Sequence, residues 1–221
     1  MSGFRLLDGL PSSDWLAADP PFGLRILAQA ALPDTLLYAD GRTLLALAGR
    51  SATLCGAGPP AWEALCRLLG AEDALRRCAP AAAEGLILRR EAAAAAAEPP
   101  PPGTLRRAYA ILAAQPGCSL DFDRFYWMRS LQRRRGVAEV YENGAATATV
   151  VRAPFGCLLT AVATDPARQG TGAATRLLRC VLDGCAGTVW LFCRPALRGF
   201  YERLDFTSAG SWRQRLDAPR A

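Results

Sequence analysis

Residues 157–178 constrain the fold most, because they read as a strand, a turn and a helix in direct succession. The apolar run 157–162 has the length and composition of a buried strand. Thr164-Asp165-Pro166 predicts a turn, since proline fixes φ and cannot donate to a strand ladder. Leucine and valine then recur at helical spacing from residue 177 to residue 182. This junction predicts an anion-binding site, because exposed backbone N–H groups and the positive end of the helix dipole meet there.

Three phosphate-binding patterns compete for the loop between this strand and helix. The P-loop pattern GxxxxGK(S/T) is excluded, because the chain contains no lysine. The dinucleotide fingerprint GxGxxG fails at Thr175, where its third glycine would stand. The pattern Q/R-x-x-G-x-G/A fits, with Gln169, Gly172 and Ala174 at its defined positions.

The stretch VATDPARQGTGAATRLL resembles the acetyl-CoA loop of the GCN5-related N-acetyltransferases (GNAT). In that family the loop amides bind the pyrophosphate of coenzyme A, which implies a binding role for Gln169, Gly170, Thr171, Gly172, Ala173 and Ala174. The preceding strand holds the pantetheine and acetyl group in the gap beside a bulge, which implies a role for Ala161, Val162, Ala163 and Thr164. The resemblance therefore makes acetyl-CoA the expected co-substrate.

The elements predicted after residue 104 follow the order of the GNAT core. They are two helices over residues 104–135, a hairpin over 137–151 with a type I′ turn at Asn143-Gly144, and strands and helices through 216. With residues 84–91 as the first strand, the resemblance covers residues 84–216. It implies an α/β (α+β) fold with a mixed, mostly antiparallel sheet and helices on both faces.

The segment GFYERLDF is the second anchor, because it resembles the FYxxxGF helix of the family. There the tyrosine protonates the sulfur of coenzyme A, which makes Tyr201 the candidate acid. A phenol stays protonated at pH 7 and can still protonate an alkylthiolate; the alternative is a core aromatic residue, as we expect for Phe200. Asp205 replaces the usual glycine at the helix C-cap, and aspartate tolerates a left-handed backbone better than most residues. Arg194 stands where an asparagine often contacts the cofactor, so it is a further candidate for cofactor binding.

The sequence leaves the general base open. It contains no histidine, which removes the usual base. The donor strand offers only Thr160 and then Asp165, and Asp165 is better suited to forming the turn. Glu139 or Glu142 could act through water, or the amine could arrive already deprotonated.

The N-terminal region, residues 1–83, predicts a small α/β unit. It contains a helix at 23–32, a hairpin at Asp40-Gly41, a strand at 51–55 and helices at 61–70 and 71–78. Its role is left open between a substrate lid and a degenerate half-copy of the GNAT fold. The alanine- and proline-rich tract 92–102 reads as a linker, while strand 84–91 is assigned to the acetyltransferase domain, residues 84–221.

Composition excludes several classes of protein. The net charge is +6, and the only dense cluster of positive residues is Arg133-Arg134-Arg135. This cluster lacks the interleaved aromatic residues that would favour nucleic-acid binding. The eight cysteines form no CxxC pair, so we expect reduced thiols and no metal site, with Cys157, Cys180 and Cys193 buried. The absence of a long apolar run and of a secretory leader predicts a cytoplasmic protein without a membrane span.

Two main hypotheses for function follow, and a third, an arginine-rich nucleic-acid binder, is disfavoured. The first is an acetyl-CoA-dependent N-acetyltransferase that acts on the primary amine of a small molecule or peptide. The alternative is a non-catalytic acyl-CoA-binding or sensor module, which the undefined base makes credible. The amine and the oligomeric state are left open, with a homodimer as one option.

Overall fold

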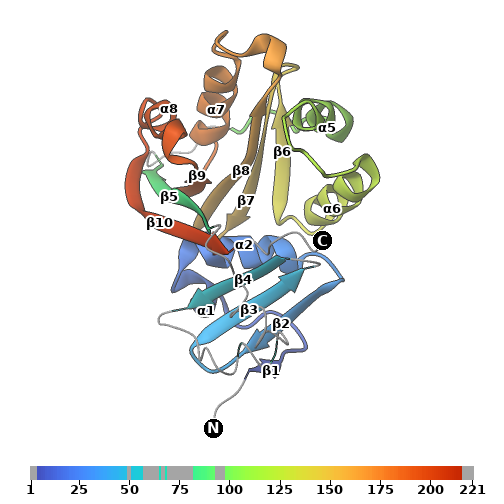
Figure 1. Cartoon of the computed structure of the whole chain (residues 1–221), viewed down its shortest axis with the longest axis vertical. Coiled ribbons are helices and arrows are strands. Elements are labelled where there is room, and N and C mark those ends of the chain that lie inside the picture. Colours follow the sequence, from blue (N-terminus) through green and yellow to red (C-terminus); the bar gives the residue numbers. More distant parts are fainter. Residues whose placement is uncertain are drawn as a thin grey trace.

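The computed structural model describes residues 4–48, 51–56, 65, 68, 82–92 and 98–215. Its strands form a four-stranded sheet, in the order β1-β2-β3-β4, and a six-stranded sheet, in the order β10-β5-β9-β8-β7-β6 (Figure 1). In the larger sheet every neighbouring pair is antiparallel except β8 and β9. The predicted mixed, mostly antiparallel sheet is therefore confirmed.

The N-terminal unit comprises β1 (Arg5–Leu6), α1 (Ser13–Ala17), α2 (Pro20–Ala30), β2 (Thr35–Ala39), β3 (Thr43–Ala48) and β4 (Ser51–Gly56). The hairpin predicted at Asp40-Gly41 is present: Asp40 Oδ1 accepts from the backbone N–H groups of Arg42 and Thr43, and Gly41 has a φ of 91°. The helices predicted for 61–70 and 71–78 lie outside the described residues, apart from Leu65 and Leu68, which are helical.

The remaining elements are β5 (Ala82–Glu91), α5 (Leu105–Ala113), α6 (Phe122–Arg134), β6 (Ala138–Glu142), β7 (Ala146–Ala153), β8 (Gly156–Thr164), α7 (Ala173–Asp183), β9 (Thr188–Cys193), α8 (Arg198–Glu202) and β10 (Thr207–Arg215). Thr104 and Asp121 cap α5 and α6 by accepting from the backbone N–H groups of Arg107 and Arg124. Short 3₁₀ turns, Pro166–Arg168 and Pro195–Leu197, follow β8 and β9.

Strand β5 does not pair with β6, the strand that follows it in the chain. It lies between β9 and β10, antiparallel to both, whereas β6, the next strand in the chain, forms the opposite edge of the sheet. Helices α5 and α6 carry the chain across. A strand's partners depend on tertiary packing, so the apolar pattern of residues 84–91 predicts a strand without fixing its place.

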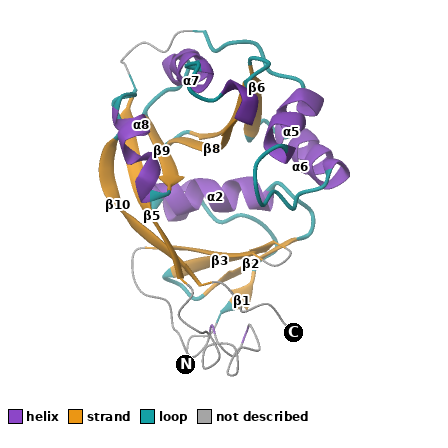
Figure 2. Ribbon diagram, turned by 45° about the horizontal axis from the view of Figure 1, so that its top comes forward, coloured by secondary structure: helices purple, strands orange, loops and turns teal. Residues whose placement is uncertain are grey.

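Helices cover both faces of the larger sheet (Figure 2). On one face, α7 and α8 pack with the sheet in a core cluster that includes Leu178, Tyr201 and Leu159. On the other face, α5 and α6 pack on β6 through a cluster that includes Phe125 and Val140. Both flanking layers follow from the apolar stripes that the sequence predicts.

Helix α2 lies between the two sheets. Its Leu24 is fully buried with Val151 and Leu158 of the larger sheet, whereas Ile26 packs with Leu44 of the smaller sheet. The rings of Phe22 and Phe192 meet edge to face, with centroids 5.1 Å apart. The two sheets therefore share α2 as a common core element.

Two smaller expectations are wrong. The turn at Asn143-Gly144 is not type I′, because only Gly144 has a positive φ and type I′ requires it at both central residues. Cys180 is exposed on α7, although Cys157 and Cys193 are buried as expected. All six cysteines in the described part of the chain are free thiols. No helix in the described ranges is long and apolar enough to cross a membrane.

Candidate functional site: a bulged strand and the loop that follows it

A β-bulge interrupts β8 at Ala161. The pairs Thr149–Thr160 and Thr147–Ala163 leave one residue of β7 opposite two residues of β8, Ala161 and Val162. Ala161 has a φ of 49°, which is rare for a residue other than glycine. The bulge turns the backbone of β8 at the position where the sequence predicts acetyl-group binding.

Beyond the bulge, β8 and β9 separate. Their parallel pairing comprises only Cys157–Val189, Leu158–Trp190 and Leu159–Leu191, although β8 continues to Thr164 and β9 to Cys193. The backbone of Ala161–Thr164 therefore faces a gap in place of a paired strand. This arrangement leaves backbone N–H and C=O groups able to bind an extended ligand in the manner of an added strand.

The loop after β8 leads into the N-terminus of α7. Gly170 and Gly172 adopt left-handed backbones with φ values of 77° and 76°, and Gly172 is the N-cap residue of α7. The first N–H groups of a helix have no intrahelical acceptor, and glycine at the N-cap adds no side chain to satisfy them. Residues 169–172 are exposed, so these donors are accessible to an anion.

Three side chains outside the predicted set hold this loop in place. Asn143 donates through Nδ2 to the carbonyl of Ala173 at 3.0 Å. Gln115, two residues after the end of α5, donates to the carbonyl of Thr164 at 2.9 Å. Arg176 donates to the carbonyl of Thr171 at 2.9 Å. The sequence signals the turn at Asn143, but no local pattern indicates these long-range bonds.

Tyr201 lies on the α7 side of the sheet, near the end of β9. Its ring packs edge to face with Phe200 and Phe206, at centroid distances of 5.0 and 5.9 Å. Burial raises the pKa of Tyr201 to about 12, and the nearby Cys193 thiol adds to the rise. Tyr201 is therefore fully protonated at pH 7, although it is a weaker acid than a free phenol.

The structure brings three predicted site residues from three elements to one hydrophobic cluster. Val162 of β8 and Ala174 of α7 both pack against the cluster that contains Tyr201. Arg194 is exposed directly after β9, on the other side of the gap from Thr164. Asp205 has a φ of 65°, so the left-handed backbone expected there is present, although the C-cap of α8 is Arg203, two residues earlier. The donor strand, the loop and the candidate acid thus border one region.

The comparisons with known proteins agree with this geometry. A sequence profile of the Acetyltransferase (GNAT) family matches residues 101–206, the segment that contains the bulge, the loop and Tyr201. Residues 101–206 therefore form a GNAT acetyltransferase domain. No protein of curated function is similar enough in sequence to match it.

Solved structures show that the likeness in fold extends to the N-terminal unit. A GCN5-related N-acetyltransferase from Sphaerobacter thermophilus is 13% identical with a TM-score of 0.54, over 97% of this chain and 96% of that one. A Drosophila protein is 13% identical with a TM-score of 0.52, over 98% and 99%. A GNAT-family protein from Novosphingobium aromaticivorans, 19% identical with a TM-score of 0.41, aligns over 61% of this chain and 66% of that one.

The observed site fits the acyl-CoA that GNAT proteins use. The separated strands offer unpaired backbone along Ala161–Thr164, and the small residues of the loop leave the N-terminus of α7 open. A Cβ added at Gly170 would meet nothing within 4 Å, which shows how much free space surrounds the loop. A pantetheine chain and a pyrophosphate require these two features.

The three carboxylates considered as a general base all have protein partners. Glu139 accepts from Arg133 Nε at 2.6 Å, and Glu142 accepts from the N–H of Gly144 at 2.7 Å. Asp165 accepts from the N–H of Ala167 at 3.0 Å, so it forms the turn as expected. Each of the three is therefore oriented by a contact within the protein.

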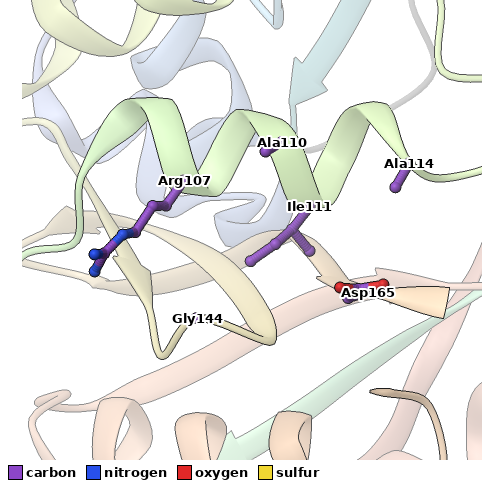
Figure 3. Close-up of a pocket in the computed structure, with 6 residues that line it drawn as sticks. All are labelled: Arg107, Ala110, Ile111, Ala114, Gly144 and Asp165. Carbon is purple, nitrogen blue, oxygen red and sulfur yellow. The ribbon is translucent and has the colours of Figure 1, made fainter. Parts of the chain in front are cut away.

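A hollow of about 520 Å³ lies beside the donor loop, between α5 and the tip of the β6–β7 hairpin (Figure 3). Helix α5 contributes one face, and Gly144 and Asp165 close the other side. The charged groups around it are balanced, because Arg107 lies 3.8 Å from Glu142 and Asp165 bonds to backbone. The hollow widens access to the end of β8.

Proposed function

We propose that this GNAT protein transfers the acetyl group of acetyl-CoA to the primary amine of a small molecule or peptide. The bulge at Ala161 carries the proposal, because it opens β8 from β9 beside the N-terminus of α7 and on the side of Tyr201. Acetyl-CoA supplies the activated acyl group. The protein's own residues would bind it, polarise its carbonyl and supply a proton.

The backbone at the bulge is suited to polarising the acyl carbonyl. Val162 is the second of the two bulged residues, so its N–H belongs to the part of β8 that no longer pairs with β9. A backbone N–H fixed by the strand can donate to the oxygen as negative charge develops on it. The N–H groups at the start of α7 would bind the pyrophosphate through Gln169–Ala174.

Tyr201 is the proposed acid. As the amine nitrogen forms a bond to the acyl carbon and the carbon–sulfur bond breaks, the phenol donates its proton to the departing sulfur. The proton lost by the amine then returns the phenol to its neutral form through solvent. Because the candidate carboxylates are engaged elsewhere, we propose that the amine reaches the site already deprotonated.

Ligand binding and turnover test the proposal separately. Acetyl-CoA at saturating concentration should raise the thermal midpoint, since a ligand that binds only the folded state stabilises it. Free thiol should then be released in the presence of a suitable primary amine. The absence of any midpoint shift would overturn the proposal. Binding without amine-dependent thiol release over a broad panel would instead favour the non-catalytic acyl-CoA-binding or sensor module.

A further inference from the structure

Arg129 on α6 is a half-buried cation, and no carboxylate forms an ion pair with it within the described ranges. Its Nε is shielded from solvent and has no hydrogen-bond partner in the described part of the chain. Its Nη1 donates to Gln132 Oε1 at 2.8 Å, and its Cζ lies 5.8 Å from the centroid of the Phe125 ring. Desolvation lowers the pKa of Arg129 to about 10. An amide and a ring satisfy the guanidinium only in part.

The other arginines that form ion pairs in the described ranges show the usual arrangement. Each is matched with a carboxylate, as in the pairs Arg107–Glu142, Arg124–Asp34, Arg133–Glu139 and Arg198–Glu202. A buried charge costs free energy unless a counter-charge and hydrogen bonds compensate it. Among the described residues no carboxylate supplies this counter-charge to Arg129, and a bound anion would supply it.

The position of Arg129 relates it to the acceptor side of the site. It lies one helical turn after Phe125, on the same side of α6, and Phe125 packs with Val140 of β6. Val140 pairs with Thr149, and Thr149 pairs with Thr160, so these side chains form one row across that face of the sheet. Thr160 directly precedes the bulge.

This face is the one opposite Tyr201. The donor loop, α7 and α8 lie on the other face, which leaves the face of α5 and α6 for the approach of a second substrate to the gap between β8 and β9. Helix α2 borders the same region, because Gln132 donates to the carbonyl of Ala28 at 2.8 Å. Arg129 is therefore held by α6 and α2 on the face from which an acceptor would approach.

We infer that Arg129 binds an anionic group of the acceptor, so that the preferred substrates are small primary amines that also carry a carboxylate or a phosphate. This inference rests on the proposed acetyltransferase function. The hollow beside α5 does not provide an equivalent site, since its arginine already faces a carboxylate. The guanidinium would fix the anion by paired hydrogen bonds and leave the amine to extend toward the bulge.

Matched pairs of amines test the inference. Thiol release from acetyl-CoA is measured with β-alanine against propylamine, phenylalanine against phenethylamine, and phosphoethanolamine against ethanolamine. The first two pairs report on a carboxylate and the third on a phosphate. We expect kcat/KM to be about 10- to 100-fold higher for the anionic member of at least one pair, the range expected of a hydrogen bond to a charged group.

Substitution of Arg129 shows whether it is the source of that preference. Arg129→Gln should abolish the preference mainly by raising KM for the anionic amine, and Arg129→Lys should retain part of it. Arg106→Gln, at an exposed position of α5, is the matched control and should change nothing. An unchanged acetyl-CoA midpoint shift in Arg129→Gln shows that the variant is folded.

The possible results separate this inference from the proposed acetyltransferase function. Equal turnover of both members of every pair, or a preference that survives Arg129→Gln, would overturn this inference and leave the acetyltransferase function standing. Acetyl-CoA binding without turnover of any amine would overturn both. Loss of the preference in Arg129→Gln alone would support both.

Discussion

At the scale of single residues, the proposed chemistry depends on one buried phenol. Tyr201 is held by aromatic contacts and by its place in a core cluster, so its ring can be retained while its hydroxyl is removed. A substitution by phenylalanine therefore tests the role of the hydroxyl as an acid separately from the packing of the ring. The sequence identifies Tyr201 through the FYERLDF segment, but the low exposure that weakens it as an acid becomes visible only in the folded chain.

Tyr201→Phe should lower kcat by about 100-fold, because a positioned general acid contributes at least that much. Acetyl-CoA binding should be retained, since the ring contacts are unchanged. Steady-state kinetics and the acetyl-CoA-induced midpoint shift measure the two effects. Tyr126→Phe removes a hydroxyl from a residue that is 52% exposed, and it should leave both values unchanged. An unaltered kcat in Tyr201→Phe would exclude the acid role.

The pH dependence should also follow from Tyr201. Its pKa is raised to about 12, so the proton needed for sulfur is present throughout the range below that value. The amine, in contrast, loses its proton as the pH rises toward its own pKa. We expect kcat/KM to increase from pH 7 to 10 without a descending limb caused by Tyr201. A fall in kcat/KM below pH 10 that is absent in Tyr201→Phe would contradict the raised pKa of Tyr201.

At the scale of elements, the proposed donor site depends on backbone conformations that residues other than glycine rarely adopt. Ala161 at the bulge and Gly172 at the start of α7 both have positive φ values. The left-handed backbone could be predicted at Gly172 and Asp205, since glycine and aspartate adopt it more readily than other residues. Alanine has no such preference, so the bulge at Ala161 was expected only from the family resemblance.

Two substitutions at Ala161 should change the stability of the bulge in opposite directions. Ala161→Gly should stabilise the protein by up to about 1 kcal/mol, because it removes the left-handed penalty of an L-residue. Ala161→Val should destabilise it by about 1–2 kcal/mol and weaken acetyl-CoA binding, because a β-branched side chain resists positive φ. Denaturant unfolding and acetyl-CoA titration give the two values. Equal stability of the two variants would show that the bulge is not strained.

The loop glycine offers a second test. Gly172→Ala should cost about 1 kcal/mol of stability, and its Cβ would lie 3.2 Å from Arg176 Nη1. It should also weaken acetyl-CoA binding, because it adds bulk where the pyrophosphate is proposed to bind. Gly136→Ala is the control, since Gly136 has a φ of 65° and open space around it but lies after α6. Equal losses of affinity in the two variants would contradict the proposed phosphate site.

At the scale of the whole molecule, the sequence predicts the elements better than their partners. The hairpin at Asp40-Gly41 depends on local chemistry and is confirmed. The helix caps at Thr104 and Asp121 depend on local chemistry in the same way. The insertion of β5 between β9 and β10 and the packing of α2 against both sheets depend on contacts remote in the sequence. Local patterns do not encode such contacts.

The shared helix α2 should make the two sheets unfold together. Leu24 is fully buried against Val151 and Leu158, although it belongs to the N-terminal unit. Leu24→Ala should destabilise the protein by about 2–5 kcal/mol, the range for a buried leucine. Because the cavity borders the larger sheet, amide protection should fall in β7 and β8 as well as in α2. Leu36→Ala, at a position 50% exposed on β2, is the control and should have little effect. Hydrogen exchange resolved along the chain measures this loss of amide protection. Unchanged protection in β7 and β8 of Leu24→Ala would show that the N-terminal unit is dispensable to the fold of the donor site.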